Sequence, residues 1–87
     1  MYDLEGAHEH SANHRDEVRV SDVCGCFYCR KIYSSDEIDE WIDEIAGIGS
    51  TALCPKCGID SVIGSAAGFP ITAEFLAAMH RRWFSTS

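Results

Sequence analysis

Two segments of the chain carry apolar residues at helical spacing. The first is preceded by Ser34 and Glu37, a serine and a glutamate three positions apart as in a capping box, and is followed by Gly47 and Gly49. Its apolar residues recur at the 3, 4 and 7 spacings of one helical face: Ile38, Trp41, Ile42 and Ile45. The sequence therefore predicts a helix from Ser35 to about Ala46.

The second segment predicts a C-terminal helix from about Ala73 to Phe84, capped by Thr72. Its apolar face consists of Phe75, Leu76, Met79 and Trp83. A thinner apolar pattern favours a short helix from Ser11 to Val20. Residues 1–10 lack periodicity and are predicted to form a flexible or loosely docked arm, which leaves residues 11–87 as a single domain.

Short β-branched or aromatic runs flank two cysteine-containing turns. Ile32 and Tyr33 follow the first turn, while Thr51–Leu53 and Asp60–Gly64 flank the second and are expected to pair as a hairpin. The predicted fold is small α+β: a zinc-ribbon-like pair of knuckle hairpins packed with two or three helices.

Composition narrows the class of protein. The chain has 87 residues, of which 46% are hydrophobic and 24% charged, as in an ordinary globular domain. It has no apolar run that could cross a bilayer and no basic, apolar leader at its start, so we expect a cytoplasmic protein without membrane contact. The net charge of −7 makes binding to nucleic acid unfavourable and leaves another protein as the expected partner. Oligomeric state stays open.

Four of the five cysteines form two CxxC pairs, Cys26/Cys29 and Cys54/Cys57, with 24 residues between the pairs. Two intervening residues let both thiolates of a pair face one ion, and two pairs complete the tetrahedral sulfur shell that zinc favours. Two disulfides are the alternative, but a cytoplasmic chain favours the metal. We predict one Zn²⁺ per chain. The same sulfur shell also binds iron.

Cys24 is the fifth cysteine and lies two positions before Cys26. It is either a buried small residue at the end of a strand or a substitute ligand or reactive thiol beside the metal. Four sulfur ligands leave no open position for water activation. The sequence therefore favours a non-enzymatic binding or regulatory module, with no catalytic residue assigned. A thiol- or metal-dependent enzyme that uses Cys24 is the less favoured alternative.

Two further groups of polar residues are candidate sites. His8, His10 and His14 lie close in sequence and are either an auxiliary metal site or ordinary polar residues. The helix predicted from Ser35 to about Ala46 is dense in acids, which form either a solvated face or a surface for a basic partner. The residues of this candidate partner surface are Asp36, Asp39, Glu40, Asp43, Glu44 and Asp60, with Glu37 and Ser61 beside them.

Two resemblances follow from these motifs. The segment from Ala52 to Gly58 resembles the second knuckle of rubredoxins, small acidic iron proteins that carry electrons, but Arg30 stands where their first knuckle has glycine. The motifs from Cys24 to Cys29 and from Cys57 to Gly64 resemble a group of small bacterial cytoplasmic proteins. That resemblance extends to Phe84 and implies a bacterial cytoplasmic location and a zinc-ribbon-like pair of knuckles. It implies no activity and no catalytic residue.

Overall fold

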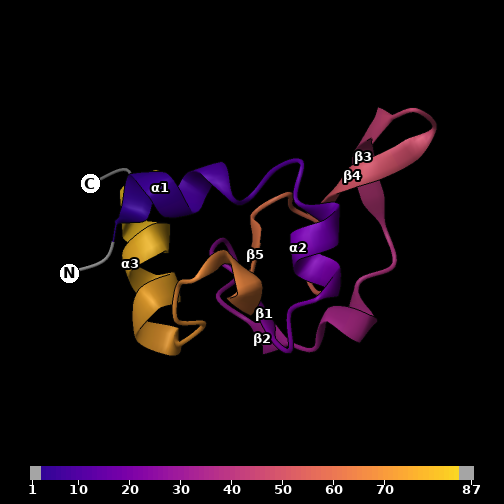
Figure 1. The fold of residues 1–87 in the computed structure, drawn as a ribbon. Helices are drawn as coiled ribbons and strands as arrows, with labels where there is room; N and C mark the ends of the chain where they lie inside the picture. Colours follow the sequence, from indigo (N-terminus) through magenta and orange to yellow (C-terminus); the bar gives the residue numbers. More distant parts are fainter. Residues whose placement is uncertain (1–2, 85–87) are drawn as a thin grey trace.

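A computed structural model describes residues 3–84 as a small α+β fold with three helices and two antiparallel sheets (Figure 1). The helices are α1 (Leu4–Glu9), α2 (Arg15–Arg19) and α3 (Ala73–Trp83), and short 3-10 turns η1 (Ser35–Glu37) and η2 (Ser65–Ala67) lie between elements. The strands are β1 (Cys24–Cys26), β2 (Ile32–Tyr33), β3 (Trp41–Ile45), β4 (Ile48–Ala52) and β5 (Val62–Gly64). The radius of gyration is 11.9 Å.

The central sheet has the order β2-β1-β5 and separates two hydrophobic clusters. Side chains alternate across a strand, so Cys24 and Cys26 face α2 and the second sheet, whereas Gly25 faces α3. A Cβ atom at Gly25 would lie 2.8 Å from Leu76 Cδ1, which shows how closely α3 packs on β1. In Figure 1 the α1–α3 layer and α2 lie on opposite sides of β1 and β5.

The predicted C-terminal helix is confirmed. The Thr72 side chain accepts a hydrogen bond from the Phe75 amide and caps α3. Phe75, Leu76 and Met79 are fully buried against β1 and β5, with Trp83 partly buried beside them. A local cap and a local apolar face were sufficient to predict this element.

The predicted helix from Ser35 to Ala46 is wrong. Its capping box forms, but it caps only the single turn η1, and the backbone is already extended at Ile38. The chain then enters β3, which pairs with β4 as a hairpin that projects from the body of the fold (Figure 1). A two-residue turn, Ala46 and Gly47 with φ of 54° and 82°, connects the two strands.

Like charges and β-branched side chains explain why a hairpin forms instead. In a helix, Asp36/Glu40, Asp39/Asp43 and Glu40/Glu44 would each lie four residues apart and repel by about 0.2–0.5 kcal/mol per pair. The isoleucines favour strands over helices because their χ1 angles are restricted. In the hairpin, Ile45 pairs with Ile48 and Ile42 with Thr51, which places the isoleucines in strands and removes the helical spacing of the acids.

The second knuckle is not a hairpin, which corrects the predicted pairing of Thr51–Leu53 with Asp60–Gly64. The strand before it, β4, pairs with β3, and the strand after it, β5, pairs with β1. Only the first knuckle connects adjacent strands of one sheet, β1 and β2. The second knuckle therefore connects the two sheets.

The N-terminal segment also differs from the prediction of a flexible or loosely docked arm. Residues Leu4–Glu9 form α1, which Asp3 caps by accepting from the Gly6 amide and which contacts α3. Ala7 is fully buried there. The helix predicted from Ser11 shortens to α2, whose N-cap is His14. Residues 1–2 and 85–87 lie outside the described part of the chain.

Candidate metal centre

The two CxxC turns have the same pattern of internal hydrogen bonds. In the first knuckle, the Tyr28 amide donates to Cys26 Sγ (3.3 Å), the Arg30 amide to the Cys26 carbonyl (2.8 Å) and the Cys26 amide to the Lys31 carbonyl (3.1 Å). The second repeats this pattern from Cys54, with donors two and four residues further on and an acceptor at the fifth. Each turn thus presents its first sulfur to an inward-directed amide.

The position after each CxxC pair has a left-handed backbone. Gly58 has a φ of 81° and Arg30 a φ of 63°. Glycine adopts this conformation without strain, whereas a residue with a Cβ is disfavoured there by roughly 1–2 kcal/mol. The structure thus gives Arg30 the backbone role that Gly58 has in the second knuckle.

The two turns bring four sulfur atoms together. Cys26 Sγ lies 3.7 Å from Cys57 Sγ, and Cys29 Sγ lies 3.7 Å from Cys54 Sγ. All four Sγ atoms are within 4.8 Å of one another. A disulfide needs sulfur atoms about 2.05 Å apart, so these distances describe free thiols. A tetrahedron with metal–sulfur bonds of about 2.3 Å has edges of about 3.8 Å, which the two 3.7 Å contacts match.

The local electrostatics differ among the four thiols. Burial raises the pKa of Cys57 to about 12 and also raises the pKa of Cys29. Burial opposes ionisation of Cys54 too, but the Tyr33 hydroxyl and the Lys56 and Cys57 amides outweigh it and lower the Cys54 pKa to about 7. Four thiolates this close repel one another, so full ionisation requires a cation among them.

Hydroxyl groups approach the first cysteine of each pair. Ser61 Oγ lies 3.3 Å from Cys26 Sγ. Tyr33 is buried, and its hydroxyl makes no hydrogen bond of normal geometry within residues 3–84. The hydroxyl nevertheless lowers the pKa of the Cys54 thiol. Tyr33 follows the first knuckle and approaches the second, whereas Ser61 follows the second and approaches the first. The sequence places Tyr33 in a strand but does not identify it as a site residue, because only the sheet topology brings it to Cys54.

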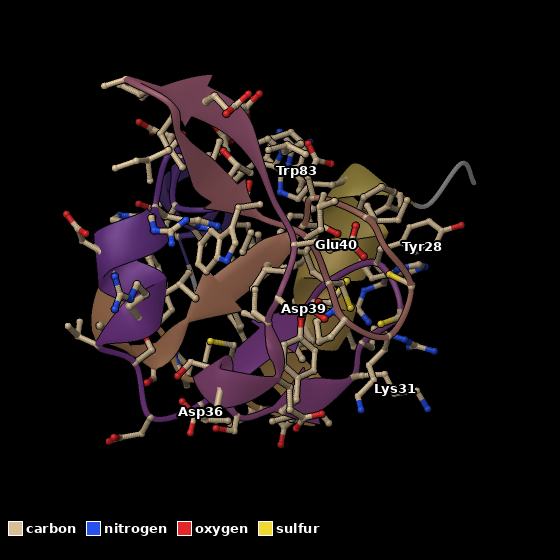
Figure 2. The ribbon with its side chains drawn as sticks, turned by 90° about the vertical axis from the view of Figure 1, so that its right-hand side faces the viewer. Tyr28, Lys31, Asp36, Asp39, Glu40 and Trp83 are labelled. Carbon is tan, nitrogen blue, oxygen red and sulfur yellow. The ribbon has the colours of Figure 1, made fainter. Side chains whose placement is uncertain are left out.

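The four-cysteine cluster can bind a metal ion. Its donors are all sulfur, its size fits the tetrahedral sites of zinc and of iron alike, and Cys26 and Cys54 are buried while Cys29 and Cys57 are partly exposed. Figure 2 shows Tyr28 and Lys31 pointing outward from the first knuckle beside the sulfur atoms. The more exposed cysteines therefore lie toward the surface of the fold.

Cys24 is not part of this cluster. It lies on β1 opposite Tyr33 and Gly64, is fully buried, and packs in the core beside Val18 and Val62. Burial raises its pKa to about 11. A buried thiol with a raised pKa is a poor nucleophile, so its environment is that of a core side chain.

The three N-terminal histidines have separate partners. The His8 ring lies 4.0 Å from the Trp83 ring, and His10 Nδ1 lies 3.0 Å from a carboxylate oxygen of Glu17. His14 is buried, donates from Nδ1 to the His10 carbonyl and accepts at Nε2 from the Ala52 amide. Burial lowers the His14 pKa. Among the described residues, no group of three possible ligands includes these histidines.

The predicted acidic surface is dispersed over several elements. Asp36 belongs to η1, and Asp39 and Glu40 belong to the segment that follows it (Figure 2). Asp43 and Glu44 belong to β3. Asp60 instead lines a small cavity of about 170 Å³ with Ser61, His8 and Phe27. The acids thus do not share one helical face.

Comparison with protein families, curated proteins and solved structures finds no match for this chain. No helix within residues 3–84 is long and apolar enough to span a membrane. The cysteine cluster and its surroundings are therefore the features of this chain that indicate a function.

Proposed function

We propose that this chain is a small zinc-binding module in which Cys26, Cys29, Cys54 and Cys57 bind one structural Zn²⁺. The observation that carries the proposal is the matched pair of 3.7 Å sulfur–sulfur contacts between the two knuckles. Each contact joins the first cysteine of one pair to the second cysteine of the other. A divalent ion there would compensate half of the charge of four thiolates, so the net charge would go from −7 to −9.

The role of the metal is to connect the two sheets. The described residues provide a small core, and domains of this size often need a metal, disulfides or a partner for stability. Since the second knuckle joins β4 to β5, a metal that binds both knuckles would fix the second sheet to the first. Four protein ligands would fill the zinc shell, so the role of the metal is structural and non-enzymatic. The module then functions by presenting a surface to another protein.

The test is native mass spectrometry and elemental analysis of untagged protein, with circular dichroism during chelator titration. We expect one zinc per chain and a partial loss of tertiary structure when zinc is removed. Cys54→Ser should abolish stoichiometric binding, whereas the matched control Cys24→Ser should retain it. Disulfide-bonded protein without metal would overturn the proposal.

An iron centre that transfers electrons is the second candidate. The partly exposed Cys29 and Cys57 favour it, since electron transfer needs a metal near the surface. One iron per chain, with a visible absorption band that bleaches reversibly on reduction, would replace zinc with iron in the proposal. Colourless protein with one zinc would exclude this candidate.

A further inference from the structure

The hairpin of β3 and β4 forms one wall of a groove at the end of the molecule. The opposite wall is the segment from Glu9 to Glu17, and the groove has a volume of about 610 Å³. His14 and Arg15 connect the two walls by hydrogen bonds. The His14 amide donates to the Ser50 carbonyl, and Arg15 Nη1 donates to the Gly49 carbonyl, both at 2.8 Å. The groove is therefore built by hydrogen bonds between the walls.

The hairpin side of this groove is apolar and exposed. Ile45 and Ile48 pair directly across the strands, so their side chains share one face of the hairpin. They line the groove with 61% and 56% of their surface exposed. The two isoleucines thus form a small exposed apolar strip at the edge of the groove.

The facing wall is acidic. Glu9, Asp16 and Glu17 line the groove from this wall. Two further acids, Asp43 and Glu44, belong to β3 in the hairpin. Within the described part of the chain, Glu17 faces His10, and the other four acids form no ion pair.

The one arginine that lines the groove, Arg15, forms no ion pair with these acids. The guanidinium group of Arg15 binds the Gly49 carbonyl and lies 4.6 Å from the centroid of the Trp41 ring. The groove therefore combines an apolar strip with an excess of acidic side chains over basic ones.

From this combination we infer that the groove binds a basic segment of a partner protein, in which apolar side chains contact Ile45 and Ile48 and flanking Lys or Arg residues pair with Glu9 and Asp16. Charge complementarity selects this occupant, because a net charge of −7 disfavours a second copy that presents the same acidic end. The inference rests on the proposed role as an interaction module and does not require that the metal be zinc.

The test is a titration of the metal-loaded full chain, followed by amide chemical shifts, with a short synthetic peptide of alternating leucine and lysine. The matched probe has glutamate in place of lysine. We expect the lysine peptide to shift amides of the groove, with an affinity that falls as salt rises, and the glutamate peptide to cause no shifts.

Matched variants locate the site. Glu9→Lys with Asp16→Lys should weaken binding by about tenfold or more, and Ile48→Ser should also weaken it. The control variants Glu74→Lys, on α3, and Ile32→Ser, on β2, should bind as the parent does. Both control positions are exposed and lie outside the groove.

Three outcomes would overturn the inference: equal affinity for the groove and control variants, equal binding of the glutamate peptide, or a dimer in solution that Ile48→Ser dissociates. Metal content, measured in the same samples, separates this inference from the metal proposal. Metal-free protein that still binds the lysine peptide in the groove would contradict only the zinc site. Zinc-loaded protein that does not bind would contradict only the groove.

Discussion

The two knuckles have the same internal hydrogen bonds but different support. The first knuckle closes a hairpin of the central sheet, buries Phe27 against α3, and accepts a hydrogen bond from His80 Nδ1 at the Phe27 carbonyl (3.1 Å). The second knuckle lies between two sheets, with Cys54 buried in the core beside Tyr33 and an exposed ion pair between Lys56 and Glu37 (2.8 Å). Exposed ion pairs add little stability. The first knuckle therefore has more support from sheet pairing and from α3, whereas the second depends more strongly on what the cysteines bind.

Metal removal should cause the largest difference in stability between the two knuckles. We expect a loss of several kcal/mol of unfolding free energy, because structural zinc binding is coupled to folding. In hydrogen exchange with mass spectrometry, amides of residues 54–59 should lose protection before those of residues 24–33. Cys24→Ser should keep the metal and the original order of protection. Equal loss of protection in both knuckles would show that the metal supports them equally.

Exchanging the left-handed residues should affect the knuckles in opposite directions. Gly58→Ala should lower the unfolding free energy by about 1–2 kcal/mol, since a Cβ is disfavoured at a φ of 81° even in open space. Arg30→Gly should raise it by up to about 1 kcal/mol, because relief of backbone strain exceeds the added entropy of the unfolded chain. Chemical denaturation of the metal-loaded proteins measures both.

Arg30→Ala is the control for the loss of the arginine side chain. It retains the left-handed strain and should leave stability close to that of the parent. A loss of stability in Arg30→Gly would show that the arginine side chain contributes more than its backbone strain removes.

These contrasts also show which features a sequence can predict. The cap and apolar face of α3 are local, and so is the CxxC spacing that identified the four cysteines. The hairpin was missed because Ile42 and Ile45 fit a helix face as well as a strand, and the choice depends on pairing with Ile48 and Thr51. The groove was missed for the same reason, since its walls come from distant segments.

The hydroxyl groups test whether each knuckle supports the other. Ser61→Ala and Tyr33→Phe should each lower the stability of the metal-loaded protein by about 0.5–1.5 kcal/mol, because each removes a hydroxyl beside a cysteine sulfur. In metal-free protein, Tyr33→Phe should be neutral or stabilising, since it removes a buried hydroxyl without a normal partner. Thermal unfolding with and without metal checks both signs. An equal effect of Tyr33→Phe in both states would contradict an interaction with the bound cysteine.

Acidification should weaken the second knuckle through His14, by a smaller amount. His14 Nε2 accepts from the amide of Ala52, two residues before Cys54, at 3.1 Å, and a protonated ring cannot accept this bond. Burial lowers the His14 pKa; the His10 carbonyl and Glu17 act against that shift, whereas the charge of His10 adds to it. The His14 contribution to stability is therefore present above the unfolded pKa of about 6.5 and declines as the pH falls below it.

The measurement is denaturation of the metal-loaded chain at pH values on either side of this range, with metal content determined at each. His14→Gln should be less stable at neutral pH but should lose less stability on acidification, because its amide does not titrate. Exchange of the Ala52 amide should accelerate in the parent before exchange in β1 does, since only β4 is bound to the imidazole. An equally steep pH dependence in His14→Gln would place the acid-sensitive group elsewhere, and the four clustered cysteines would then be the groups to examine.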